Sequence, residues 1–212
     1  MKKLILLVSI FLALSASVRA QDKQADEAAI RACFANYQAA TAKKHGQSVA
    51  ALVSKQTISY YEYILKLVMT GDEPTIRKQK YYRKMMVLQV RHEIPNLSVT
   101  NGAQLFALVV SKGWNSSAPE GGIKLGKIST SETVAVAPGV LNGVETPATF
   151  FFSRAGKLWK VDLVGVILRL EQLMAEQQKK SSLSEDEAIT TSLEKRSGRP
   201  VSKDIWKPLK AK

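Results

Sequence analysis

The spacing of apolar residues changes partway along the chain. In the first half they recur at every third or fourth position, which is typical of one face of an α-helix. In the second half they alternate with polar residues or form short runs bounded by turn residues, as in β-strands. Helices followed by strands favour an α+β fold, with helices packed on a curved antiparallel sheet, over alternating βαβ units.

Four helical segments are expected before the strands. They cover residues 22–44, 47–70 with a break near 54–57, 74–93, and 103–112. Pro74 suits the first position of a helix, and Gly113 suits the position just after one. In the first segment Ile30, Cys33, Phe34 and Tyr37 share one stripe, so Cys33, the only cysteine, is interpreted as a core residue.

Four strands are expected next, over residues 123–129, 133–141, 146–153 and 158–167. Asn142-Gly143 predicts a hairpin, and Arg154 to Lys157 predicts a second tight turn. A polar helix over 168–180 follows. A further helix over 184–196 is predicted in the charged tail, because Ser184 and Glu187 have the spacing of a capping box.

The N-terminus has the pattern of a secretory signal. Lys2 and Lys3 precede an uncharged apolar run at 4–14, and Val18 and Ala20 occupy the positions that signal peptidase reads. The run is too short to cross a bilayer as a helix, which takes about 20 residues. We therefore expect cleavage after Ala20, a periplasmic or secreted location and no membrane span.

The chain is strongly basic. Its formal net charge is +13, with a pI near 9.8, and removing Lys2, Lys3 and Arg19 with the signal leaves +10. This excess indicates an acidic protein partner or an anionic surface, although solubility alone also explains a modest excess of lysine. Export argues against nucleic acid as the partner.

The hairpin segment Phe150 to Leu163, F-F-F-S-R-A-G-K-L-W-K-V-D-L, follows a long first helix that contains a tyrosine. In these features the chain resembles the NTF2-like (SnoaL-like) superfamily. The resemblance implies a cone in which a curved sheet wraps around a pocket plugged by the first helix. On this basis residues 1–20 form the signal, 21–168 the NTF2-like domain, and 169–212 a helical, charged extension.

Enzymes of that superfamily usually place an Asp, His or Tyr inside the cone as a general acid or base. Asp162 is the catalytic candidate here, although Lys160 shares its strand face and an ion pair is the simpler interpretation. The proposed pocket residues are Tyr37, Tyr60, Trp159 and Asp162. His45 and His92 lack metal-ligand spacing, and no cofactor motif is recognised, so neither a metal nor a cofactor is expected.

A basic stripe is predicted on the third helical segment. Arg77, Lys80, Lys84 and Arg91 cluster opposite the apolar Tyr82, Met86 and Val90, so they are expected to be exposed together. The stripe is interpreted either as a solvated face or as a docking site for an acidic partner.

The preferred hypothesis is an exported, non-enzymatic binding protein. Its concrete version, by analogy with the family, is an immunity-type protein that neutralises an antibacterial effector in the periplasm. One alternative is an NTF2-like enzyme or small-ligand carrier that uses the cone pocket. Another is an envelope-surface protein that binds anionic lipid or polymer.

Overall fold

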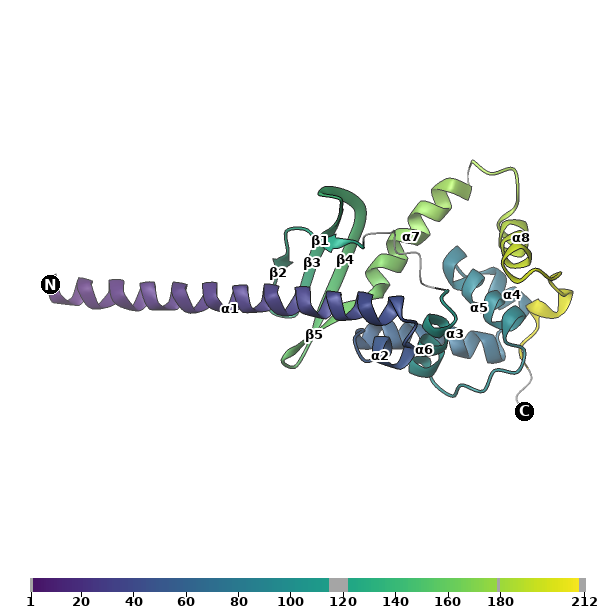
Figure 1. Cartoon of the computed structure of the whole chain (residues 1–212), viewed down its shortest axis with the longest axis horizontal. Coiled ribbons are helices and arrows are strands. Elements are labelled where there is room, and N and C mark those ends of the chain that lie inside the picture. Colours follow the sequence, from purple (N-terminus) through teal and green to yellow (C-terminus); the bar gives the residue numbers. More distant parts are fainter. Residues whose placement is uncertain (1, 115–121, 179, 210–212) are drawn as a thin grey trace.

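The computed structural model describes residues 2–114, 122–178 and 180–209. Helix α1 (Lys2–Ala42) crosses one face of an antiparallel sheet and ends beside a group of shorter helices (Figure 1). Helices packed on a curled, half-barrel sheet confirm the expected α+β class.

The sheet has the order β1-β3-β4-β5, with β2 also paired to β3. Its strands are β1 (Lys124–Leu125), β2 (Ser129–Thr130), β3 (Val134–Leu141), β4 (Val144–Ala155) and β5 (Leu158–Asp162). Both predicted hairpins are confirmed. Asn142 and Gly143 have φ of 51° and 82°, as the tight turn between β3 and β4 requires, and β4 pairs directly with β5.

Aromatic side chains hold α1 against the sheet. The Phe34 ring lies 4.6 Å from Phe150 and 6.2 Å from Phe152, measured between centroids. Cys33 and Phe34 are buried in this layer, which confirms the core role of Cys33. Trp159 is 4% exposed, and its indole Nε1 donates to Asp26 of α1 at 3.1 Å, so it packs on the helical layer.

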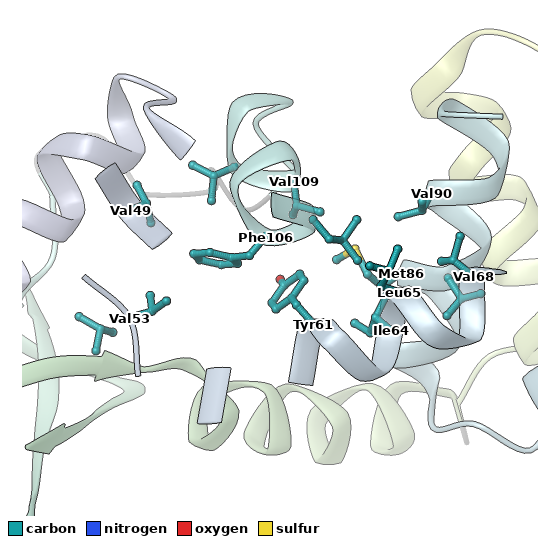
Figure 2. Close-up of a cluster of buried hydrophobic side chains, with 14 of the residues drawn as sticks. Val49, Val53, Tyr61, Ile64, Leu65, Val68, Met86, Val90, Phe106 and Val109 are labelled. Atoms are coloured by element: carbon teal, nitrogen blue, oxygen red, sulfur yellow. The ribbon is translucent and has the colours of Figure 1, made fainter. Parts of the chain in front are cut away.

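The remaining helices form a helical lobe at the end of α1. Those before the sheet are α2 (Gly46–Ala50), α3 (Lys55–Thr70), α4 (Glu73–Arg77), α5 (Tyr81–Glu93) and α6 (Gly102–Ser111). Figure 2 shows the core of this lobe, where Tyr61 and Phe106 lie between the valines of the α2 region and Met86 of α5. Gly113 follows α6 with φ of 73° and completes a Schellman turn, as its position predicted.

The chain after the sheet returns to the lobe. Helix α7 (Leu163–Gln178) leaves the end of β5, and α8 (Glu185–Ser197) and the 3₁₀ helix η1 (Lys203–Trp206) follow. The capping box of Ser184 and Glu187 is confirmed at the start of α8. Ile189, Leu193 and Ile205 are buried in the same hydrophobic cluster as α3 and α5.

Three of the predicted elements have wrong bounds. The single strand expected over 123–129 is replaced by two short strands, β1 and β2, with residues 126–128 outside both. The segment 74–93 is not one helix but α4 and α5, separated at residues 78–80. The strand predicted over 158–167 ends at Asp162, where α7 begins. Asp162 Oδ1 accepts from the Val164 N–H at 2.9 Å, and Thr57 Oγ1 accepts from the Leu163 N–H at 2.9 Å. These contacts satisfy N–H groups that the first turn of a helix leaves free.

Among the helices of the described residues, none combines the length and apolar character needed to cross a membrane.

Candidate functional site

The four residues of the predicted basic stripe are not exposed together. Arg77 and Lys80 lie at the surface, whereas Lys84 is 5% and Arg91 4% exposed. The expectation of a common exposed face is therefore wrong. Its physical cause is the tail, which covers the side of α5 that the helical pattern assigned to solvent.

Lys84 is paired with acidic residues of the tail. Its Nζ lies 2.7 Å from Glu185 Oε1 and 3.1 Å from Asp186 Oδ1. Both acids belong to the first turn of α8, where the helix dipole favours negative charge. Arg77 also pairs with Asp186, and its guanidinium lies 4.1 Å from the centre of the Trp206 ring. The acidic partner of this part of the stripe is the chain's own tail.

Arg91 has a different set of partners, all of them backbone carbonyls. Its guanidinium donates to Leu67 at 2.8 Å, Val68 at 3.1 Å, Gly71 at 2.6 Å and Ile205 at 3.2 Å. The first three carbonyls lie at the C-terminal end of α3, where intrahelical donors run out. Burial lowers the pKa of Arg91 to about 10, so it remains a cation at neutral pH. Arg91 thus caps α3 and ties η1 to it.

The proposed pocket residues on β5 lie on opposite faces of the sheet. Trp159 faces α1, where Arg154 lies 4.8 Å from its ring centre and pairs with Asp26. Asp162 shares the other face with Phe151, its directly paired neighbour on β4, and caps α7. One cavity on a single face of the sheet therefore cannot be lined by both.

The ion pair expected between Asp162 and Lys160 does not occur among the described contacts. Instead Lys160 Nζ donates to the carbonyl of Ala51 at 2.6 Å. This bond and the Val53–Val161 bridge join the loop before α3 to the edge of β5. Lys160 therefore joins the sheet to the helical lobe, whereas Asp162 caps the start of α7.

The two tyrosines of the proposed pocket belong to the aromatic layer of the helices. Tyr37 stacks with Phe34 at 6.5 Å, and burial raises its pKa to about 12. Burial likewise raises the pKa of Tyr60, against the opposing effect of Arg83, whose guanidinium lies 5.2 Å from the Tyr60 ring centre. Both phenols therefore stay protonated near neutral pH and are poorly suited to act as general bases.

The other titratable candidates also have structural contacts. His92 Nε2 lies 2.8 Å from Ser197 Oγ of the tail, and burial, with Arg199 nearby, lowers its pKa. His45 is exposed just before α2. Burial raises the pKa of Cys33, which disfavours the reactive thiolate. Within the described ranges, no group of three or more His, Cys, Asp or Glu side chains is placed to hold a metal ion.

Sequence patterning missed a second set of basic residues. The stretches 28–61, 94–114 and 122–131 contain no Asp or Glu, yet they include several exposed cations. Five of these exposed cations form a set that we call the basic ridge: Lys43, Lys44, Lys112, Lys124 and Lys127. The absence of Asp and Glu from these stretches was the sequence signal that could have indicated a basic surface. The stretches are far apart in sequence, however, so only the fold shows that they meet.

Comparisons of the chain with protein-family models, curated proteins and solved structures found no match.

Proposed function

We propose that this protein is exported and acts as a non-enzymatic binding protein for an acidic protein partner. The carrying observation is the amount of uncompensated positive charge. Within the described residues, the ion pairs involve four basic side chains, Arg77, Lys84, Arg154 and Lys207. The chain without its signal has a net charge of +10. Most of this excess faces solvent, where it can attract an acidic surface over a distance.

The packing of α1 is compatible with export and signal removal. The described side-chain contacts between α1 and the sheet begin at Asp26, which bonds Arg154 and Trp159. Figure 1 shows the N-terminal part of α1 extending beyond the sheet. Cleavage after Ala20 would leave these contacts in place. The proposed location is the periplasm or the secreted fraction.

We extend the proposal to a distant NTF2-like protein of the immunity type, which neutralises an antibacterial effector. The F-F-F-S-R-A-G-K-L-W-K-V-D-L segment forms the paired part of the β4–β5 hairpin and ends at Leu163, the first residue of α7, and α1 lies across one face of the sheet. This arrangement supports the resemblance. The immunity-type role is proposed by analogy with exported members of that superfamily.

The proposal is tested by affinity capture with the processed protein from envelope extract, at low and at high salt. We expect one acidic protein to be retained in stoichiometric amount at low salt and released at high salt, since salt screens exposed charges. An unrelated protein of equal net charge serves as the control. Equal capture by the control would contradict the proposal. Recovery of only lipid, of cell-wall polymer or of a bound small molecule would contradict it as well.

A further inference from the structure

The basic ridge is brought together by contacts of α1. The Arg31 guanidinium donates to the carbonyls of Leu125 at 2.7 Å and Gly126 at 2.9 Å. About two turns further along α1, Gln38 Nε2 donates to the carbonyl of Ile123 at 2.8 Å. These bonds hold the segment that carries Lys124 and Lys127 alongside the second half of α1.

The other end of the ridge is formed where α1 and α6 end. Gly46 packs so closely on α6 that a Cβ there would lie 2.0 Å from the Ala107 carbonyl oxygen and 2.7 Å from Ser111 Oγ. Lys43 and Lys44 precede this contact and Lys112 follows Ser111, so the three exposed lysines belong to chain segments that meet at this corner. The stretch of α1 from Arg31 to its last residue, Ala42, is about 16 Å long. The basic ridge is therefore an elongated surface along this part of α1, not a compact cluster.

The ridge lysines differ from those of the α5 stripe in how they are compensated. All five are exposed, and none takes part in an ion pair within the described part of the chain. The acidic first turn of α8 occupies Lys84 instead. Lysines at helix C-termini are favoured by the helix dipole. That accounts for Lys43, Lys44 and Lys112, but not for Lys124 and Lys127 on the neighbouring β segment.

The apolar surface helps to select the kind of partner. The large apolar side chains that are exposed lie on α3, β3, β4, β5 and α7 and at Leu183; among the side chains whose exposure is described, none lies on residues 22–42 of α1 or on α2, α6 or β1. Docking on a membrane surface usually combines basic residues with apolar side chains that enter the lipid. A purely hydrated, elongated basic surface fits an acidic polypeptide better.

We infer that the basic ridge is the docking surface for an extended acidic segment of a protein partner. This inference rests on the proposed function and adds the place and the form of recognition. Binding is dominated by charge, so it is fast at low salt and weakens as salt rises.

The test compares two triple variants that remove the same charge. The ridge variant carries Lys43→Gln, Lys112→Gln and Lys124→Gln, and the control carries Lys78→Gln, Lys80→Gln and Lys203→Gln, which are also exposed. Binding of a fluorescent oligoglutamate peptide is measured across a salt series. We expect the ridge variant to bind about tenfold more weakly, with a shallower salt dependence, and the control to change about twofold or less. Both variants should melt as the wild type does.

Three results of the peptide and vesicle measurements would overturn the inference. Equal weakening in both variants would show a response to net charge alone. Unchanged binding in the ridge variant would place the contact elsewhere. Binding to phosphatidylglycerol vesicles without binding to the peptide would assign the ridge to lipid. Repeating the affinity capture from envelope extract with the wild type and the ridge variant separates a failure of the ridge from a failure of the proposed binding function. If the ridge variant still captures the acidic protein fully, the ridge is wrong and the binding function stands. If the wild type captures no protein, the function is wrong whatever the peptide does.

Discussion

At the scale of single residues, burial assigns different roles to cations that the helical pattern grouped together. Lys84 sits against two carboxylates, Arg91 against four carbonyls, and Lys80 lies in solvent. A buried cation is tolerated only where its donors are satisfied. Lys84 and Arg91 therefore contribute to holding the tail on the helical lobe rather than to a surface for a partner.

Replacing Arg91 with alanine should reduce the free energy of unfolding by about 3 kcal/mol, because four carbonyls at the end of α3 and in η1 lose the guanidinium donor, and only those of Leu67 and Val68 keep another described donor. Arg91→Lys should lose less, since an ammonium group keeps the charge but cannot match the guanidinium fork. Arg196→Ala, at an exposed position, is the control. Urea unfolding measures all three, and a loss for Arg91→Ala no larger than that of the control would contradict the capping role.

Trp159→Ala should destabilise the fold by about 3–5 kcal/mol, the usual effect of truncating a buried aromatic residue. The neighbouring Leu158 is 61% exposed, so Leu158→Ala should change stability by less than about 0.5 kcal/mol. Thermal melting of the two variants compares the faces of β5. Similar shifts for both would mean that the faces do not differ as described.

His92 should make stability depend on pH. Its pKa is lowered in the folded state by burial and by Arg199, so folding favours the neutral ring. The stabilisation is present above the ordinary histidine pKa, about 6.5, and is lost as the pH falls through the lowered value. The wild type should therefore lose more stability between about pH 7 and pH 5 than His92→Gln does. Parallel stability curves for the two proteins would refute this.

At the scale of elements, boundaries with local signals were predicted and boundaries with distant ones were not. The capping box of α8, the Asn142-Gly143 turn and the glycine after α6 act within a few residues. The separation of α4 and α5 has a different origin. The Tyr82 N–H at the start of α5 donates to Glu171 Oε2 of α7 at 3.1 Å, a cap supplied from far along the chain.

The local cap of α8 leads to a specific expectation. Ser184→Ala should reduce the free energy of unfolding by about 1 kcal/mol, because the Glu187 N–H loses its acceptor, the Ser184 hydroxyl. The reciprocal bond, from the N–H of residue 184 to Glu187 Oε2, is then no longer supported by the serine side chain. Ser182→Ala is the matched control at an exposed position outside the box. Denaturant midpoints give the comparison. A smaller effect at Ser184 than at Ser182 would argue that α8 is held by Ile189 and Leu193 alone.

At the scale of the whole molecule, the proposed export can be checked on the protein itself. The periplasmic or secreted form should begin at Gln21, because Val18 and Ala20 satisfy the cleavage rule. Intact mass and N-terminal sequencing identify the end. An Ala20→Arg variant, which removes the small residue at the cleavage position, should accumulate uncleaved. Recovery of wild-type chain of full length in the membrane fraction would contradict the prediction.

The α+β order, the hairpin turns, the burial of Cys33 and the α8 cap could all be predicted from the sequence. Each depends on periodicity or on contacts a few residues apart, which a linear pattern records. Whether the residues of the basic stripe are exposed depended on tertiary structure. A second layer, formed by α8 and η1, covers the side of α5 that its sequence pattern leaves polar. The basic ridge was equally hidden, since Arg31 and Gln38 join α1 to residues more than 80 positions away. Periodicity shows which side of a helix can be buried, whereas only packing decides whether its charged side meets water or another part of the chain.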